Sequence, residues 1–450
     1  MNSLPPEADR HLQRWRSSVP LSPPRSLALV FVVLVLIGGS TLLLPGMTHT
    51  PITPLQAFFT ATSATMVTGL SVVDTGSTFT GMGQFVIAVM MQVGGVGTMA
   101  FAALALLVSG GRPPLRTQVL VGEAIGQTSF RDLRRVIRLA LFVAVAVEGA
   151  GAVVLTVRLA QDFALPQALW LAVFHSVSAF NNAGFGLWPD SLTRYATDPI
   201  FVAVISLQII IGGLGFVVLA DPRLLRGRAS LHSRITLAGT AVLLFGGTAL
   251  FWWLEAHNTH TLAAQNLGGQ AQLAWFMSVV PRTAGFNSVD VASMTPGATL
   301  LTMLLMFIGG GTGSTAGGVK VTTVVIMLAA TFAVLRQRSE PVLFGRALST
   351  DSVFRAFAVL TVSGLTLVVA LLLLVLTQPL PFLDLAFEAV SAFATVGMTR
   401  GITDDLNSVG QLLIMLLMFV GRVGPLTLAY ALATAAPSRV QYPKAEVYVG

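Results

Sequence analysis

The chain has 450 residues, of which 54% are hydrophobic and 10% are charged, and its formal net charge is +7. An ordinary soluble domain is about one quarter charged, so the composition excludes a soluble globular protein. The sequence has no cysteine, which excludes disulfides, thiolate metal sites and cysteine nucleophiles. The arginines lie in short segments between apolar runs, a pattern that membrane topology explains better than nucleic-acid binding does.

The polar residues 1–26 precede an apolar run of full membrane length that has no clear small-residue cleavage site, so we predict an uncleaved first helix. Crossing a bilayer takes about 20 apolar residues, and eight runs are predicted to span: 27–44, 83–108, 136–159, 200–220, 235–255, 299–335, 353–376 and 411–433. The eight spans form four consecutive pairs. Between the two members of each pair lies one run of about half that length, which is predicted to be re-entrant: 55–64, 168–180, 271–280 and 382–393.

Eight spans place both termini on the same side of the membrane. If that side is cytoplasmic, the outer segments carry only four basic residues and two more lie within spans, leaving 20 of the 26 Lys and Arg on the inside. Such a bias predicts cytoplasmic termini in a multi-pass protein of the cell (inner) membrane. The four outer basic residues are Arg158, Arg194, Arg282 and Arg400, and the two within spans are Lys320 and Arg422.

The chain repeats internally. Residues 300–309 (LLTMLLMFIG) return as residues 412–421 (LLIMLLMFVG), and the same offset of 112 residues relates Gly285 to Gly397. We therefore predict an all-α membrane protein in which four tandem units of helix, re-entrant loop and helix surround one pore with pseudo-four-fold symmetry. The predicted divisions are 1–26 (cytoplasmic), 27–110 (unit 1), 111–222 (unit 2), 223–338 (unit 3), 339–434 (unit 4) and 435–450 (cytoplasmic tail).

One glycine follows each half-length run, in a polar and extended setting. Irregular backbone at membrane depth is tolerated only where it is buried in protein or lines water, so the four segments should share an aqueous axis. Backbone carbonyls turned inward can replace the hydration shell of a cation, and glycine permits the positive φ that this requires. The predicted filter residues are Val67, Thr68, Gly69, Asn182, Ala183, Gly184, Thr283, Ala284, Gly285, Thr395, Val396 and Gly397.

The run 299–335 is too long for one span, and a dense set of small residues interrupts it. Six glycines and several hydroxyls break a helix, which favours a loop below the filter over glycines that only pack helices together. The interruption consists of Gly309, Gly310, Gly311, Thr312, Gly313, Ser314, Thr315, Ala316, Gly317 and Gly318. Part of it matches a dinucleotide fingerprint, but a membrane-length helix precedes it instead of a strand, so we reject nucleotide binding there.

Four ionisable residues inside predicted membrane segments are candidates for a functional role. Arg422 must face a partner or water, because an arginine at the bilayer centre costs about 2.5–3.5 kcal/mol or more, and the loop's carbonyls or hydroxyls are natural acceptors. Lys320 either repels cations at a closed gate or snorkels to the interface. His175 is predicted to form hydrogen bonds behind the filter, and Glu148 receives no role. The four are dispersed, so no catalytic residues are predicted.

These segments resemble the filters of the Trk/Ktr/HKT potassium transporter superfamily, and the resemblance covers nearly the whole chain. It is carried by residues 61–70 (ATSATMVTGL), 174–185 (FHSVSAFNNAGF), 282–286 (RTAGF) and 393–397 (FATVG). The tail 442–450 (YPKAEVYVG) is more similar to the KtrB branch than to TrkH. The resemblance implies that residues 309–318 form an intramembrane gate, with Arg422 placed against it and Lys320 beside it.

The same resemblance implies a homodimer with one pore per subunit and a cytosolic KtrA-like ring as partner. Potassium would be the permeant ion, held only by filter carbonyls, and the regulatory nucleotide would bind the partner, leaving this chain without a cofactor. Sodium activation and coupling to other ions stay open. Partners other than the ring and the lipid bilayer, nucleic acid included, are not expected.

Two features depart from the family pattern. The four filter segments share only their glycine, so discrimination against sodium should be weaker than in a symmetric channel. Arg400, three residues after the fourth filter glycine, stands where this family is expected to have a small or neutral residue. It should slow cations unless Asp404, Asp405 or Asp290 neutralises it.

Two other functions remain alternatives: a secondary transporter of another cation or small solute, and a TrkH-like subunit. A secondary transporter with broken helices is commonly built from two inverted halves, whereas four similar units running in the same direction favour a pore.

Overall fold

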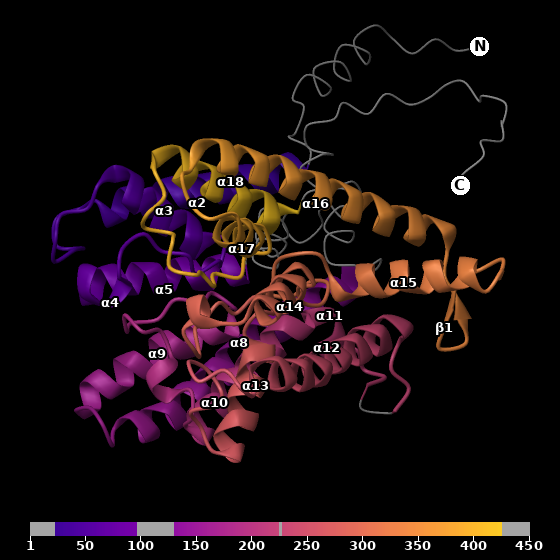
Figure 1. The fold of residues 1–450 in the computed structure, drawn as a ribbon, viewed down its shortest axis with the longest axis horizontal. Helices are drawn as coiled ribbons and strands as arrows, with labels where there is room; N and C mark the ends of the chain where they lie inside the picture. Colours follow the sequence, from indigo (N-terminus) through magenta and orange to yellow (C-terminus); the bar gives the residue numbers. More distant parts are fainter. Residues whose placement is uncertain (1–22, 97–129, 225–226, 425–450) are drawn as a thin grey trace, which may run out of the picture.

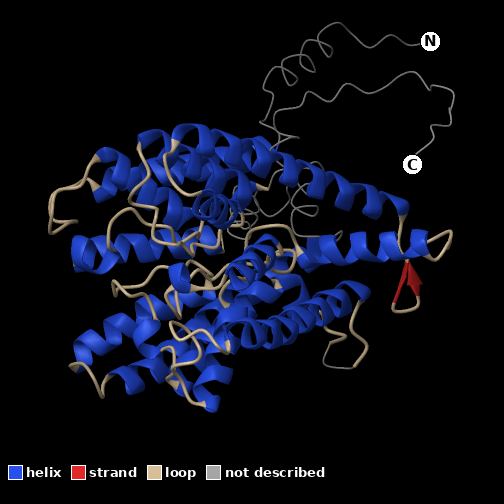
Figure 2. Ribbon diagram, viewed as in Figure 1, coloured by secondary structure: helices blue, strands red, loops and turns tan. Residues whose placement is uncertain are grey.

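A computed structural model describes residues 23–96, 130–224 and 227–424 of the chain. Nearly all regular structure in these residues is helical, and the one sheet among them is a two-residue hairpin, β1 (Val342–Leu343) paired with β2 (Arg346–Ala347) (Figure 2). The predicted cytoplasmic segments 1–26 and 435–450 lie largely or wholly outside the described residues.

Four helix pairs follow one another along the chain. In each pair a longer helix packs on a shorter one that comes directly after it, and a third helix follows further on (Figure 1). The pairs are α2 (Pro23–Leu42) with α3 (Pro54–Thr65), α8 (Phe130–Leu159) with α9 (Leu165–Phe180), α12 (Leu231–Glu255) with α13 (Leu267–Val279), and α16 (Thr350–Thr377) with α17 (Phe382–Phe393). The third helices are α5 (Gly81–Gly95), α10 (Pro199–Leu214), α14 (Pro296–Phe307) and α18 (Ser408–Val423).

Short elements complete the chain between these helices. They are α4 (Thr75–Thr78), η1 (Thr193–Tyr195), α11 (Phe216–Leu219) and η2 (Val291–Ser293). Helix α15 (Val321–Leu335) continues the direction of α14 after the glycine-rich loop, and the hairpin at its far end leads into α16 (Figure 1).

Local sequence explains where the helices begin. Thr53 and Gln56 form a capping box at the start of α3, where Pro54 is the first helical residue. Side-chain caps start α10 at Asp198, α14 at Thr295 and α18 at Asn407, each accepting a backbone N–H of the first turn. These polar residues are the breaks that separate the apolar runs in the sequence.

Three described helices have the length and apolarity to cross a membrane: Arg138–Leu159, Leu231–Glu255 and Thr350–Thr377. Seven further apolar helices have 10–17 residues. Two predicted spans are broken. Gly215, at φ +96°, separates α10 from α11 within 200–220, and the glycine-rich loop separates α14 from α15 within 299–335. Parts of the spans 83–108 and 411–433 lie outside the described residues.

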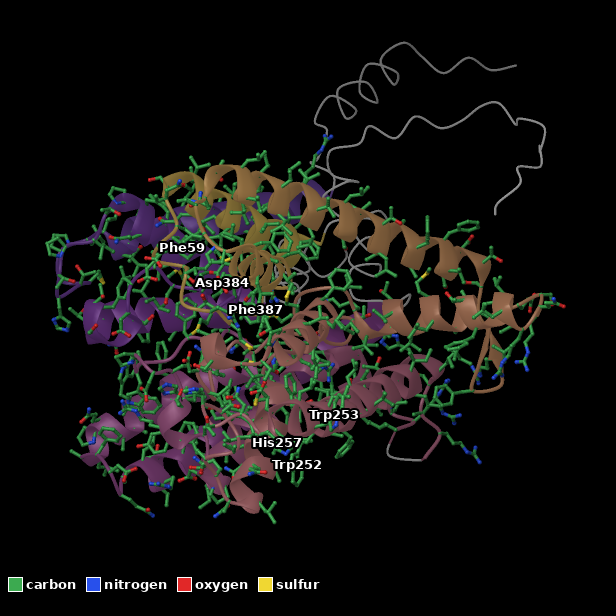
Figure 3. The ribbon with its side chains drawn as sticks, viewed as in Figure 1. Phe59, Trp252, Trp253, His257, Asp384 and Phe387 are labelled. Atoms are coloured by element: carbon green, nitrogen blue, oxygen red, sulfur yellow. The ribbon has the colours of Figure 1, made fainter. Side chains whose placement is uncertain are left out.

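Large apolar side chains lie both inside the molecule and on its outer surface. Phe387 of α17 is fully buried, whereas Trp253 near the end of α12 is 75% exposed (Figure 3). Phe142 of α8 and Leu376 of α16 are also exposed. An apolar surface of this kind, far larger than a soluble monomer shows, is what a helical membrane protein presents to lipid.

Candidate functional site

The four short helices α3, α9, α13 and α17 end at the four predicted filter segments, and their last turns hold these segments by hydrogen bonds. The Ser63 carbonyl accepts the N–H of Thr68 (2.8 Å), and the Ser63 hydroxyl accepts that of Gly69 (3.0 Å). Ser391 binds Val396 and Gly397 in the same way, at 2.9 and 3.0 Å. A serine six residues before the filter glycine thus anchors the segment.

The third segment is anchored differently. Val279 occupies the position of the serine. The N–H groups of Ala284 and Gly285 both donate to the carbonyl of the next residue, Val280, at 2.9 and 3.3 Å. In the second segment the carbonyl of Ser178 accepts the N–H of Ala183 at 2.8 Å. This serine spacing occurs in three units of the sequence, and these serines are not among the predicted site residues.

Each filter segment has the same backbone pattern, in which two residues with positive φ flank one ordinary residue. The φ angles are 56° and 94° at Val67 and Gly69, 56° and 71° at Asn182 and Gly184, 80° and 72° at Thr283 and Gly285, and 51° and 97° at Thr395 and Gly397. Non-glycine residues seldom adopt this conformation, and valine and threonine less than most. Its occurrence at four matching positions indicates a shared constraint on how the carbonyls are directed.

The four glycines form a closed ring. A Cβ added to Gly69 would lie 2.6 Å from the carbonyl oxygen of Ala183, and one added to Gly184 would lie 2.9 Å from that of Ala284. A Cβ on Gly285 would overlap the Val396 oxygen, and one on Gly397 would overlap the Thr68 oxygen. Each segment therefore touches the next in chain order, and the fourth touches the first. The chain's four predicted filter segments come together around one centre.

The predicted gate loop, residues 309–318, is closed at its base. Gly309 N–H donates to the Val319 carbonyl (2.9 Å), Val319 N–H to Phe307 (3.2 Å) and Val321 N–H to Gly310 (3.1 Å). These bonds hold the end of α14 beside the start of α15, so the loop leaves the helix and returns to it at the same place.

The loop packs on the end of α10 through backbone hydrogen bonds. The N–H of Gly311 donates to Gly213 (2.8 Å), that of Thr315 donates to Gly212 (3.2 Å), and Gly313 accepts the N–H of Phe216 (3.0 Å). A Cβ on Gly311 would overlap the Leu214 oxygen, so glycine is required for this approach.

The same loop touches two of the filter segments. Asn182 donates from Nδ2 to Thr315 Oγ1 (2.9 Å), and Thr315 Oγ1 lies 3.2 Å from the Phe180 carbonyl, to which it donates. A Cβ on Gly317 would overlap Thr395 Oγ1. The loop therefore lies directly against segments 2 and 4.

Arg422 joins the loop to α5. Its side chain is 9% exposed, and its guanidinium donates to the carbonyl of Thr315 and to those of Gly94 (2.5 Å) and Gly95 (3.0 Å). In the described part of the chain no carboxylate lies within ion-pair distance, so these carbonyls are the acceptors of the buried cation, and its Nε has no hydrogen-bond partner there. The sequence pointed to acceptors in the loop, but it did not reveal the two in α5.

The side chain of Lys320 forms hydrogen bonds with the loop that precedes it. Its Nζ donates to the carbonyls of Ala316 (2.7 Å) and Gly317 (3.3 Å), which lie four and three residues earlier. The cation therefore caps the loop's own last turn, a role that neither of the two sequence interpretations included.

Arg282, counted by the topology prediction among the outer basic residues, is 7% exposed, and its Nη2 lies 3.4 Å from both Thr240 Oγ1 and the Gly309 carbonyl. His175 is fully buried. Its Nδ1 lies 2.7 Å from the Leu171 carbonyl, and its Nε2 accepts the N–H of Leu187 (3.3 Å), as expected for hydrogen bonding behind the filter.

Arg400 has a different partner from those proposed. It pairs with Asp384 of α17 at 2.6 Å, instead of Asp404, Asp405 or Asp290, and it donates to the carbonyls of Val291 (3.0 Å) and Ala292 (3.1 Å). Sixteen residues separate the partners in sequence, and the turn after segment 4 folds back on its own helix to bring them together.

Glu148 also has a partner. Asn181, which caps α9 and precedes segment 2, donates from Nδ2 to Glu148 Oε1 (3.1 Å) and to Gln92 Oε1 (2.7 Å). The sequence also allowed a pair between Glu148 and Arg138, but the contacts in the structure are to side-chain amides. Within the described ranges, no group of three or more His, Asp or Glu side chains is arranged to hold a metal ion.

Comparison with known proteins identifies the family. The sequence model of the cation transport protein family TrkH matches residues 17–225 and 233–441. The chain is 39% identical to the Ktr system potassium uptake protein B of Bacillus subtilis (strain 168), over 96% of this chain and 98% of that one, and 41% identical to the protein of that name from Vibrio alginolyticus, over 95% of each. It is 37% identical to the potassium/sodium uptake protein NtpJ of Enterococcus hirae, over 96% and 98%.

The solved structure of the potassium transporter TrkH from Vibrio parahaemolyticus has the same fold, with a TM-score of 0.73 at 20% identity over 92% of this chain and 86% of that one. The chain belongs to the TrkH cation transport protein family, and the predicted resemblance to the Trk/Ktr superfamily and its KtrB branch is confirmed.

Proposed function

We propose that this chain conducts potassium across the cell membrane through a filter made by Val67–Thr68–Gly69 and the three matching segments. The closed ring of four glycines carries this proposal, because it brings the carbonyls of four irregular segments to one axis. Carbonyl oxygens so placed can replace the hydration shell of the ion. The names of the curated relatives, which are potassium uptake proteins, support potassium as the permeant ion.

We further propose that residues 309–318, with Lys320 and Arg422, are the gate. The loop lies against segments 2 and 4, and its buried backbone is held by hydrogen bonds from Arg422 and Lys320 and by the end of α10. Moving it aside means breaking these bonds together, which is the behaviour of a two-state barrier and not of a flexible linker.

The same proposal includes the arrangement in the membrane and the partners. The four units at 27–110, 111–222, 223–338 and 339–434 each supply two spans and one re-entrant helix, with cytoplasmic termini. The chain forms a homodimer and binds a cytosolic nucleotide-binding ring of the KtrA type. The word "system" in the names of two relatives supports a further component.

Rubidium uptake into sealed proteoliposomes tests the proposal, with potassium, sodium and caesium as competitors and with the ring partner absent or present. We expect potassium to block uptake far better than sodium. Equal block by both ions would remove the selective filter. Absence of uptake even with the partner supplied would favour a secondary transporter of another solute.

A further inference from the structure

A fully buried carboxyl group lies behind the fourth filter segment. Glu388 of α17 has no exposed surface, and its Oε1 accepts a hydrogen bond from Thr403 Oγ1 at 2.6 Å. Its Oε2 is buried with no hydrogen-bond partner, and in the described part of the chain no cation lies within ion-pair distance of it. Burying such a group is costly, whereas an apolar side chain would pack there without that cost.

Glu388 stands nine residues before its filter glycine, and the equivalent position in the other short helices is informative. It holds His175 in α9, Thr60 in α3 and Phe276 in α13. His175 is also fully buried, and it accepts the N–H of Leu187. Thr60 donates only to the Gln56 carbonyl of its own helix, and phenylalanine offers no acceptor at all.

Both acceptors bind the chain that follows their own filter segment, one at a backbone N–H and the other at a side-chain hydroxyl. Leu187 lies three residues after Gly184, and Thr403 lies six residues after Gly397, so each acceptor ties its short helix to the chain that leaves its own filter segment. Thr403 Oγ1 is also 3.0 Å from Thr399 Oγ1, which extends the link toward Gly397. Two segments are braced at this position, and two are not.

The braced segments are opposite each other. The glycine contacts run in the order 69, 184, 285, 397 and back to 69, so segments 2 and 4 face each other across the ring. Both also contact the gate loop, through Asn182 and Thr395, and Arg282, just before segment 3, reaches the Gly309 carbonyl of the loop at 3.4 Å. The two braced segments thus lie on one diagonal of the filter, and both of them also touch the loop.

We propose that Glu388 is a positioning residue for potassium selectivity, acting with His175 as one of two diagonal braces that fix the carbonyls of segments 4 and 2. The proposal rests on the proposed potassium pathway. In it, Glu388 acts as a hydrogen-bond acceptor for Thr403 and touches no ion. Segments 1 and 3 keep the hydrogen bonds from the last turns of their helices but have no acceptor at the brace position, so selectivity depends on the braced pair more than on the other two.

The test measures the ratio of sodium to potassium concentrations that half-block rubidium uptake, in proteoliposomes of the full chain. We expect Glu388→Ala and His175→Ala each to lower this ratio about tenfold, which corresponds to ~1.4 kcal/mol. Glu388→Gln keeps an acceptor and should stay within about twofold of wild type. Thr60→Val and Phe276→Leu change the equivalent positions of the unbraced segments and should also stay within about twofold.

Thr403→Val removes the donor without touching the buried carboxyl, and it should reproduce the effect of Glu388→Ala. If Glu388→Ala does not elute as a folded protein on size exclusion, the sodium-to-potassium ratio of Thr403→Val tests the brace in its place. An unchanged ratio in Thr403→Val, or an equal loss in Glu388→Gln and Glu388→Ala, would overturn the brace. A wild-type protein with no potassium preference would instead refute the proposed pathway, so the two failures are distinguishable.

Discussion

The side-chain amide of Asn182 donates a hydrogen bond to the hydroxyl of Thr315 over 2.9 Å, and this bond joins segment 2 to the 309–318 loop. Both side chains are 1% exposed. A loop that left this position would break the bond and leave a buried amide without a partner, at a cost of about 1–3 kcal/mol. The geometry of segment 2 and the position of the loop are therefore coupled.

A double-mutant cycle measures this coupling. Asn182→Ala and Thr315→Val should each raise rubidium uptake by the chain alone, because each removes a bond that holds the loop against segment 2. The double variant should raise it no further than the larger single effect, since both changes break the same bond. Strictly additive effects on the logarithm of the uptake rate would show that the two residues act independently.

Gly285→Ser should reduce the preference for potassium over sodium. The residue has φ +72°, and a Cβ would overlap the carbonyl oxygen of Val396 in the next segment. The left-handed conformation alone costs a non-glycine residue about 1–2 kcal/mol. Competition of sodium with rubidium uptake provides the measurement.

Gly364→Ser is the matched control for that change, because Gly364 lies within α16 and an added Cβ would meet no atom within 4 Å. Its ion preference should equal that of wild type. If Gly285→Ser keeps the wild-type preference while the protein remains folded, Gly285 is not part of the filter.

Arg422→Ala should raise uptake by the chain alone several-fold. The carbonyls of Thr315, Gly94 and Gly95 all accept hydrogen bonds from Arg422, so the arginine links the loop to α5. The substitution removes these charge-assisted bonds, each worth about 1.5–3 kcal/mol. Arg422→Lys retains the charge but has no planar fork that can reach acceptors on two elements, so an intermediate rate is expected. Uptake that falls in Arg422→Ala, with normal elution on size exclusion, would contradict a tethering role.

Asp384→Asn should slow potassium uptake at low ionic strength, because it leaves the Arg400 cation near the turn after segment 4 without its carboxylate. The defect should shrink in high salt, because screening shortens the reach of a charge at the mouth of the pathway, although less than for a fully exposed one, since the Arg400 side chain is 13% exposed. Arg400→Gln should change the rate by less than about twofold, since the arginine charge is already paired. Asp404→Asn serves as the control, and an equal defect in it would return the role to one of the three aspartates that the sequence suggested.

The sequence revealed those parts of the site that depend on backbone conformation. Glycine at 69, 184, 285 and 397 and the cluster at 309–318 were visible because few other residues permit positive φ or backbone contact this close. The breaks between helices were visible because caps and prolines interrupt apolar runs.

Partners that meet only through tertiary packing were not predictable. The Arg400 and Asp384 pair forms because the chain after segment 4 folds back on α17, and the sequence spacing favoured nearer acids instead. The burial of Arg282 and the contact of Asn181 with Glu148 likewise depend on how separate helices pack together. The break at Gly215 was missed because a single glycine in an apolar run commonly stays helical.

The ring of glycines also bears on how the four units have changed relative to one another. Neighbouring segments meet through glycine Cα atoms and main-chain oxygens, whereas side chains such as Glu388 and His175 lie behind them. Because the ring contacts are made by main-chain atoms, they place little restriction on which side chains the segments carry. Repeated copies of an ancestral unit can therefore diverge at almost every position, provided that each keeps its glycine. One copy can then carry the 309–318 loop and another the Arg422 that binds it, without disturbing the ring that all four share.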